Sequence, residues 1–358
     1  MQKKAAALVL VCAGLATWSA CGKKSNNYVY GALPAVSQIA IFREDPNSGT
    51  LTSLATSPVT AGPGVQSIAI HPSNKFLYAS NAGEGDISLF TISTGTLTEV
   101  TPRTVVGTTP TQLIMDSAGT FLYVANVGSN NISVFSIDSS SGALTAVAGS
   151  PFQIGLPPIN MRLSPSGSVL YVTGANGGGQ PGVIQGFNVN AGVITTVVPG
   201  SPFQAGTTPI GLAIDSTGSH LYTSNAAPDN SISEFTINSD GSLTQLPGSP
   251  IGESYSNPIS LLIDVTGKYL FVTNQGSNNV AAYSIGSDGS LTLLTNSPFA
   301  TGAQPNSIGT DPSGRYIFIG NQTSSAIQSF NLDRSTGTLT SVASYAVGGT
   351  PTSIAVSP

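Results

Sequence analysis

Arg162 has the strongest potential for chemistry, because it is the one charged residue in a set of strand-like segments that we expect to line a central channel. Its segment, residues 160–163, alternates polar and apolar side chains as a half-buried strand does. In each such segment we expect one set of alternate residues, among them Ile114, Ala213 and Leu262, to face the channel. A guanidinium in a narrow channel can anchor a carboxylate or phosphate, since it donates two parallel hydrogen bonds. The alternative is that Arg162 bonds backbone carbonyls and fills space.

Neutral polar residues near the starts of the corresponding segments complete the candidate ligand site. They are Gln66, Gln112, Asn160, Ser260 and Asn306. Amides and hydroxyls can hydrogen-bond a sugar or a lactone, but they are poor proton acceptors. The pattern therefore predicts a binding surface, and it leaves the catalytic residues unknown.

Residues that could catalyse hydrolysis are poorly represented. Opening a lactone needs an activated water and stabilisation of the oxyanion. The sequence shows no carboxylate–histidine pair and no Gly-x-Ser-x-Gly elbow. His71 and His220 fall in or beside expected turns, on the face opposite the candidate site. Four aspartates recur with the repeat described below and are interpreted as turn formers: Asp116, Asp215, Asp264 and Asp311.

Metal and cofactor sites are not expected. Glu84, Asp86 and Asp229 lie in expected loops and are candidate calcium ligands, but they lack the spaced carboxylates of a dedicated site. Five asparagines end a strand near the candidate site: Asn81, Asn126, Asn225, Asn274 and Asn321. They either form a hydrogen-bonding rim for a sugar or peptide or cap the turn that follows, and we favour capping.

A repeated unit positions these residues. An aromatic residue in an aliphatic-rich strand recurs at Tyr78, Tyr123, Tyr171, Tyr222, Phe271 and Phe318, with spacings of 45, 48, 51, 49 and 47 residues. The segment 28–30 fits the same slot one unit earlier, which makes seven units. A period near 45–50 residues with four short strands per unit is typical of propeller blades. We therefore predict an all-β, seven-bladed β-propeller.

The two ends of the chain are expected to complete one blade together. Residues 351–356 resemble a first strand with no later strands after it, and residues 28–54 supply the later strands with no first strand before them. Pairing them would close the ring and remove exposed sheet edges. Repeated Ser-Pro pairs fit the outer edges of the blades, because proline cannot donate to a ladder.

The N-terminus is interpreted as a targeting segment. Lys3 and Lys4 precede an apolar run, residues 5–16, too short to span a bilayer. Cys21 follows small residues as in a bacterial lipobox, although Trp18 departs from that pattern. The expected domains are a signal peptide at 1–20, a lipidated Cys21 with a tether at 21–27, and the propeller at 28–358.

Composition restricts the partners. Charged residues are 8% of the chain and the formal net charge is -5, so nucleic acid is not an expected partner. Membrane contact is expected only through the lipid anchor. We expect an extracytoplasmic protein, either a lipoprotein of the outer membrane or cell surface or a secreted or periplasmic protein. The partner is an unknown small molecule, such as a sugar or lactone, or an envelope protein.

Several blade motifs resemble known families. YVAN at 123–126, FVTN at 271–274 and YVTG at 171–174 are similar to the YVTN repeats of bacterial surface propellers. DPSG at 311–314, followed by Phe318, resembles the seven-bladed lactonase family, which includes 6-phosphogluconolactonases. That family usually carries Arg or His directly after the proline of the inner strand. Here those slots hold other residues: Gln66, Thr111, Ile159, Ile210, Ile259, Asn306 and Thr352.

Three functions fit these observations. The first is a lipid-anchored propeller that binds a ligand or partner protein at the cell envelope. The second is a lactonase-like hydrolase that uses Arg162 with Gln112 and Asn160 to hold an acidic sugar lactone. The third is a purely structural surface repeat protein. A deep channel crowded with polar groups would favour the second, and a flat, capped face would favour the first or third.

Overall fold

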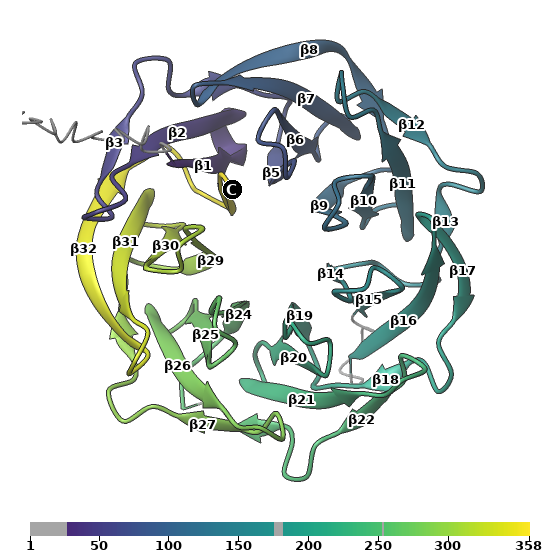
Figure 1. Cartoon of the computed structure of the whole chain (residues 1–358), viewed down its shortest axis with the longest axis vertical. Coiled ribbons are helices and arrows are strands. Elements are labelled where there is room, and N and C mark those ends of the chain that lie inside the picture. The colour runs from purple at the N-terminus through teal and green to yellow at the C-terminus, as the bar shows by residue number, and fades with distance from the viewer. Residues whose placement is uncertain (1–26, 175–181, 253) are drawn as a thin grey trace, which may run out of the picture.

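The computed structural model is a ring of seven antiparallel sheets (Figure 1). It describes residues 27–174, 182–252 and 254–358, so the expected signal peptide and Cys21 lie outside it. Blades are numbered 1 to 7 along the chain, blade 1 being the one that holds both ends. The predicted seven-bladed propeller is confirmed.

Each blade runs from an innermost strand at the channel to an outer strand at the rim. The innermost strands of blades 1 to 7 are β33 (Ser353–Val356), β5 (Val65–Ile70), β9 (Pro110–Met115), β14 (Asn160–Leu163), β19 (Pro209–Ile214), β24 (Pro258–Ile263) and β29 (Pro305–Thr310). The second strands, in the same order, are β1 (Asn27–Leu33), β6 (Phe76–Asn81), β10 (Phe121–Asn126), β15 (Val169–Gly174), β20 (His220–Asn225), β25 (Tyr269–Asn274) and β30 (Tyr316–Asn321). The third strands are β2 (Gln38–Glu44), β7 (Asp86–Ser93), β11 (Asn131–Ile137), β16 (Val183–Asn190), β21 (Ser231–Ile237), β26 (Asn279–Ile285) and β31 (Ala326–Asp333). A short 3-10 turn, η1 (Pro34–Val36), joins β1 to β2.

The outer strand takes two forms. It is continuous in blades 2 and 7, as β8 (Thr96–Val105) and β32 (Thr338–Ala346). In the other blades two short pieces both pair with the third strand: β3 (Leu51–Ser53) and β4 (Val59–Thr60), β12 (Leu144–Ala146) and β13 (Phe152–Gln153), β17 (Val193–Val197) and β18 (Phe203–Gln204), β22 (Leu243–Gln245) and β23 (Ile251–Gly252), and β27 (Leu291–Leu293) and β28 (Phe299–Ala300). The second piece was not predicted.

The Ser-Pro pairs lie at these breaks in the outer strand, as expected. Proline interrupts the ladder there, and the serine before it replaces the missing contact. In blade 3 the Ser150 hydroxyl accepts a hydrogen bond from the backbone N–H of Val134 at 2.9 Å, and in blade 6 Ser297 accepts one from Ala282 at 3.0 Å. The Ser-Pro pair therefore ties the outer edge to the third strand.

Hydrophobic clusters lie between neighbouring blades. One cluster joins Val29 of blade 1 to Phe318 of blade 7, and another joins Tyr30 of blade 1 to Leu77 of blade 2. Tyrosines of the second strands also connect neighbouring blades, because their hydroxyls donate hydrogen bonds to backbone carbonyls of the next blade. The Tyr171 hydroxyl donates to the Gly241 carbonyl of blade 5 at 2.7 Å, and burial raises the pKa of this phenol above its usual value, which keeps it a donor.

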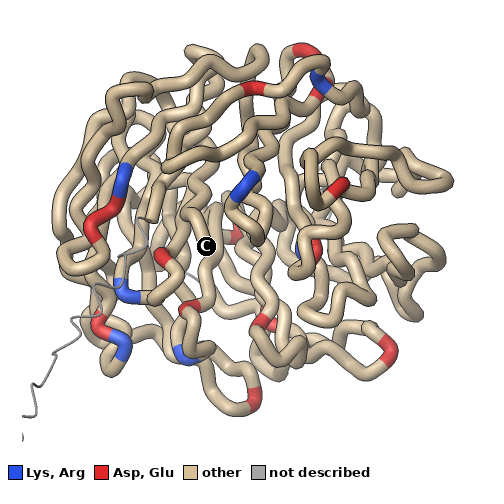
Figure 2. The backbone as a smooth tube through the Cα atoms, turned by 45° about the horizontal axis from the view of Figure 1, so that its top comes forward, with Lys and Arg blue, Asp and Glu red and all other residues tan. Residues whose placement is uncertain are grey.

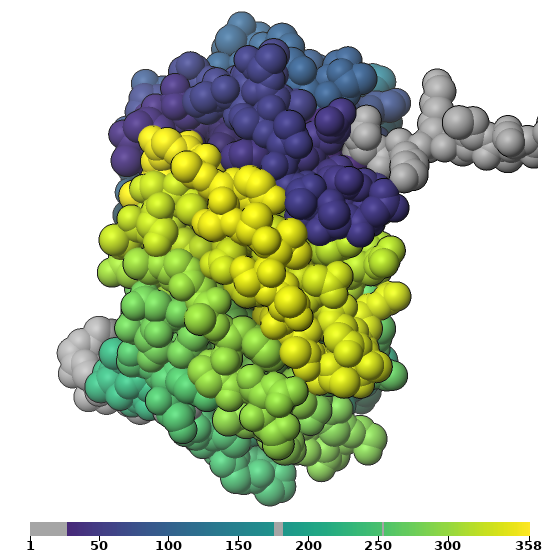
Figure 3. All heavy atoms as spheres, turned by 90° about the vertical axis from the view of Figure 1, so that its left-hand side faces the viewer, coloured from purple at the N-terminus to yellow at the C-terminus, as the bar shows by residue number. Residues whose placement is uncertain are grey.

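Ring closure follows the predicted scheme. The C-terminal β33 pairs antiparallel with β1, with Val356 opposite Val29 and Ser353 opposite Ala32. The backbone N–H of Tyr28 also donates to the Ser357 hydroxyl at 2.8 Å. Figure 3 shows the C-terminal strands lying against the N-terminal blade along one side of the molecule.

Candidate functional site

A cavity of about 260 Å³ occupies one end of the central channel, and all seven innermost strands or the residues just before them line it. The structure brings all six predicted ligand-site residues to this cavity: Gln66, Gln112, Asn160, Arg162, Ser260 and Asn306. They come from blades 2, 3, 4, 6 and 7, so residues up to 240 positions apart in the sequence meet here. The lining is mostly polar, and the site is a pocket, not a flat, capped face.

Arg162 is the only charged residue that lines this cavity among the residues the structure describes. Its Nη1 donates to the carbonyl of its neighbour Met161 at 3.2 Å. No carboxylate in the described ranges forms an ion pair with it. Burial lowers the pKa of the guanidinium from its usual value, although arginine stays charged near neutral pH. The guanidinium therefore keeps unused donors next to the cavity.

Arg162 also lines a second cavity of about 210 Å³, together with Asp215 and Leu262. It thus lies at the boundary between two hollows of the channel. We therefore treat the larger cavity as a pocket with Arg162 at its floor.

Two polar side chains at the floor are held in place by each other. The Gln112 Nε2 donates to the Asn160 Oδ1 at 3.0 Å, and the Gln112 Oε1 accepts from the backbone N–H of Met161 at 2.5 Å. This joins blades 3 and 4 beside Arg162. Other polar atoms have no hydrogen-bond partner among the described residues although they are buried, including Thr111 Oγ1, Asn306 Oδ1 and Ser307 Oγ. Buried polar groups of this kind normally have a partner, so they are suited to bind a ligand or water.

One prediction about the channel wall is wrong in part. We expected alternate residues of each inner strand to face the channel, among them Ile114, Ala213 and Leu262. All three pack in clusters between blades and none of them lines the larger cavity, although Ala213 and Leu262 line the second one. The reason is that both faces of a blade contact a neighbouring blade, so alternation places both sets of side chains between sheets. Only the inner edge and the first residues of the strand face the cavity.

The histidines and turn aspartates lie away from the cavity, as predicted. His71 is buried and bonds Ser73 at 2.8 Å and the Gly119 carbonyl at 2.9 Å. Asp264 accepts the backbone N–H groups of Lys268 and Tyr269, both at 2.8 Å, which is how it forms the turn.

The expectation that no carboxylate pairs with a histidine is also wrong. Asp215 Oδ2 and His220 Nδ1 are 2.9 Å apart across the turn between β19 and β20. Burial alone would raise the pKa of Asp215, but hydrogen bonds from His220, Ser219 and Thr217 hold it below its usual value. The pair is at the other end of the channel from the larger cavity, so it cannot serve that site as a base.

The asparagines that end the second strands cap the following turn and do not form a rim. Asn126 is fully buried, and its Nδ2 donates to Asn131 Oδ1 and Ser133 Oγ, both at 2.9 Å. The approach to this side chain is closed by Gly107, where a Cβ would lie 2.7 Å from Asn126. The capping interpretation is confirmed.

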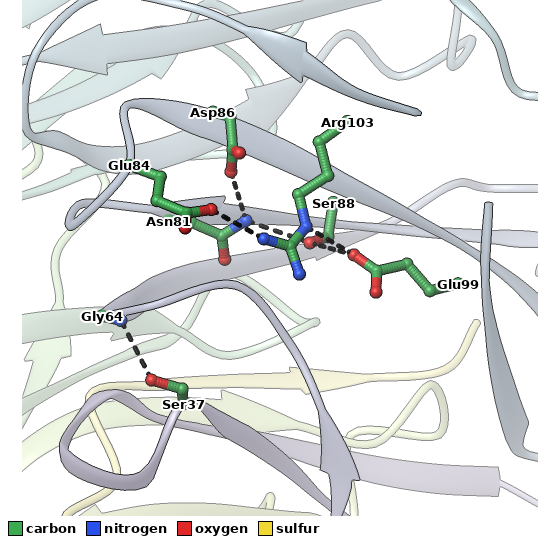
Figure 4. Close-up of polar contacts among 8 residues, drawn as sticks. All are labelled: Ser37, Gly64, Asn81, Glu84, Asp86, Ser88, Glu99 and Arg103. Atoms are coloured by element: carbon green, nitrogen blue, oxygen red, sulfur yellow. Dashed lines mark hydrogen bonds and ion pairs between the residues drawn. The ribbon is translucent and has the colours of Figure 1, made fainter. Parts of the chain in front are cut away.

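The loop carboxylates also have internal partners (Figure 4). Arg103 bonds Glu84 at 2.8 Å and Glu99 at 2.7 Å, and Asn81 donates to Asp86 at 2.7 Å. Within the described ranges no three His, Cys, Asp or Glu side chains are placed to hold a metal ion. Figure 2 shows how sparse charged residues are over the whole ring.

The architecture and the pocket define a class of protein: a closed seven-bladed propeller with a ligand-sized pocket at the channel. The family model described as lactonase, seven-bladed β-propeller, matches residues 21–159 and 256–356. These ranges are more than half of the chain, which therefore belongs to the seven-bladed β-propeller lactonase family.

Solved structures with the same fold include two proteins with related names. One is a putative 6-phosphogluconolactonase from Bacteroides fragilis, with a TM-score of 0.80, 21% identity, and coverage of 94% of this chain and 99% of the other. Another is a periplasmic gluconolactonase from Pseudomonas aeruginosa, with a TM-score of 0.72, 18% identity, and coverage of 93% and 99%. At these identities the likeness extends to the fold alone. No curated protein sequence matches the chain significantly.

Proposed function

We propose that this lactonase-family propeller binds a small organic acid, or the lactone of one, in the channel pocket with Arg162 as the anion anchor. The observation that carries the proposal is a half-buried guanidinium with no acidic partner among the described residues, at the floor of a polar pocket. A charge that is partly removed from water and has no partner of opposite charge costs the fold free energy. We expect such a charge where a ligand of opposite charge binds it.

The purely structural reading is less well supported. A repeat protein without a ligand would gain stability from filling its channel with apolar side chains, because buried unpaired polar groups cost free energy. The pocket instead keeps Arg162 and several unpartnered oxygens. A partner protein would need an exposed surface, whereas these groups are recessed.

The first prediction concerns Arg162. Gluconate, titrated into the native chain at pH 7 by calorimetry, is expected to bind, and Arg162→Gln is expected to weaken binding by a factor of about 10–100. The reason is the loss of charge-assisted hydrogen bonds worth about 1.5–3 kcal/mol. Arg334→Gln is the matched control, because Arg334 is exposed and its Nη1 donates to the Ser313 carbonyl at 3.1 Å, outside the pocket. Equal affinity in the native chain and in Arg162→Gln would refute the proposal.

Hydrolysis is the second candidate function. A deep, polar pocket and family membership favour it. Arg162 could stabilise the oxyanion formed when water attacks a lactone carbonyl. However, no carboxylate, imidazole, thiol or amine lines the pocket among the described residues, so the water would lack a general base. Assaying the same variants with sugar lactones, phosphorylated and not, separates the two functions. Turnover above the spontaneous rate in the native chain that is lost in Arg162→Gln would make the protein a hydrolase.

Export and lipid anchoring belong to the same proposal. The basic, apolar and small-residue order of residues 3–21 supports it, and an extracytoplasmic site argues against a phosphorylated cytoplasmic metabolite as the ligand. No helix in the described part of the chain is long and apolar enough to cross a membrane. In cell fractionation, Cys21→Ser is expected to move the protein from the membrane fraction to the soluble fraction. A variant that stayed with the membranes would contradict the lipid anchor.

A further inference from the structure

The mouth of the pocket is divided into an apolar side and a polar side. The mouth is a ring of seven residues, one from each blade, at the position directly after the inner-strand proline or its equivalent. Blades 4, 5 and 6 contribute Ile159, Ile210 and Ile259, and blades 7, 1, 2 and 3 contribute Asn306, Thr352, Gln66 and Thr111. We call these the isoleucine arc and the polar arc. Because blades of each kind are consecutive, the two arcs face each other across the channel.

The isoleucine arc is not part of the packing between blades. All three side chains are partly exposed and line the cavity. The clusters that join blades 3 to 6 are formed in the described structure by other residues of the same strands, such as Met161, Leu212 and Leu261. Apolar side chains that face a water-filled cavity stabilise the protein only when apolar atoms of another molecule cover them. The arc is therefore available to a ligand.

The polar arc offers unused hydrogen-bonding atoms. Thr111 Oγ1 and Asn306 Oδ1 are buried without a partner among the described residues. Thr352 Oγ1 donates to the Gln66 carbonyl at 2.8 Å, which fixes this hydroxyl with its lone pairs free to accept. These groups favour hydroxyl groups on the ligand edge that faces them.

Arg162 supplies the third element. It follows Ile159 by three residues, which is about 10 Å along a strand. A small acid whose carboxylate meets the guanidinium can therefore place the rest of its body between the two arcs.

We propose that the ligand is a monocarboxylic hydroxy acid, or its lactone, with one apolar edge, rather than a fully hydroxylated sugar acid. The carboxylate binds Arg162, the hydroxyl group faces the polar arc, and an aryl or alkyl edge packs on the isoleucine arc. This inference rests on the proposed function, because it needs an acid at Arg162. The single guanidinium matches one negative charge, so a doubly charged phosphate ester is a poorer fit.

Mandelate is the probe for this inference, because it carries a carboxylate, one hydroxyl group and a phenyl ring. Gluconate is the matched acid without an apolar edge. In calorimetric titrations of the native chain, mandelate is expected to bind at least tenfold more tightly than gluconate. Ile210→Asn, in the middle of the arc, is expected to weaken mandelate binding at least tenfold and gluconate binding by a clearly smaller factor.

A second variant protects the test against misfolding. Ile210→Val keeps an apolar side chain, and it should retain mandelate binding within about threefold. Circular dichroism and the melting temperature of each variant show whether the ring is intact, and Ile159→Asn repeats the test at a neighbouring blade if Ile210→Asn fails to fold.

The possible results separate the two proposals. Gluconate binding as tightly as mandelate, with both lost in Arg162→Gln, would overturn the apolar-edge inference and leave the proposed function standing. Failure of both acids to bind would overturn the proposed function and this inference with it. Mandelate preference that disappears in Ile210→Asn and persists in Ile210→Val would support both.

Discussion

Glu44→Gln is expected to raise the free energy of unfolding at pH 8 by about 2–3 kcal/mol and to remove most of the loss of stability between pH 4.5 and 7. Glu44 ends β2 and is 1% exposed. Burial raises the pKa of its carboxyl from 4.5 to about 7, and the nearby Asp311 and Asp45 add to the rise, while the Asn27 side chain acts in the opposite direction.

The sign of the effect follows from linkage. Between pH 4.5 and 7 the unfolded chain has lost the Glu44 proton while the folded chain still holds it, so unfolding releases a proton. Stability therefore falls as the pH rises through this window and levels off above pH 7. Glutamine is neutral at every pH, so it does not incur the cost of a buried charge.

Chemical denaturation of the native chain and the variant at pH 5, 7 and 8 measures this effect. Glu84→Gln is the control for loss of one glutamate, because Glu84 is exposed and its ion pair with Arg103 is worth about 0–1 kcal/mol. If Glu44→Gln and the native chain showed the same stability at pH 5 and pH 8, the buried carboxyl would not be the source of the pH dependence.

Removal of residues 350–358 is expected to destroy the folded monomer. The truncation removes β33, so β1 would present a bare edge with Val29 and Ala32, both fully buried in the native ring. It also removes Ile354 and Val356, which pack against the cluster between blades 1 and 7. Exposed strand edges pair with other chains, and we expect aggregation.

Size-exclusion chromatography and thermal unfolding measure the result. A chain that lacks Pro358 alone is the control, because that residue is exposed and lies beyond β33. A truncated protein that stayed monomeric with an unchanged melting temperature would show that the ring closes without the terminal strand.

The fold could be predicted from the sequence because the blade repeats. The aromatic of the second strand, for example Tyr171 or Tyr222, recurs at nearly constant spacing, and so one local pattern predicts seven sheets. The split outer strands were missed, since β13 and β18 have only two residues each. A segment that short has no periodicity to detect.

The position of the candidate site could be predicted for the same reason. Arg162, Gln112 and Asn160 occupy repeat positions near the start of an inner strand, and every such position converges on the channel. The sequence could not show which side chains of an inner strand face the cavity and which pack against a neighbouring blade. Ile114 and Leu262 alternate with buried residues like channel residues, yet they pack between blades. The Asp215–His220 pair was missed because its partners lie five residues apart across a turn, and only the turn geometry brings them together.

The two arcs at the pocket mouth could be recognised only from the order of the blades around the ring. Ile159, Ile210 and Ile259 are about 50 residues apart in the chain, and their grouping matters only once consecutive blades are known to be neighbours. The sequence shows that these slots lack the Arg or His usual in the lactonase family. The structure adds that three of the replacements line the pocket from consecutive blades, opposite four polar ones.

The most direct test of the central claim is the crystal structure of the native chain grown with gluconate and, separately, with mandelate, each paired with Arg162→Gln crystals. If Arg162 anchors an acid, we expect electron density for a carboxylate within hydrogen-bonding distance of its guanidinium in the native crystals, and no such density in the variant. An empty pocket in the native crystals, or the same density in Arg162→Gln, would contradict the claim that this channel is an acid-binding site.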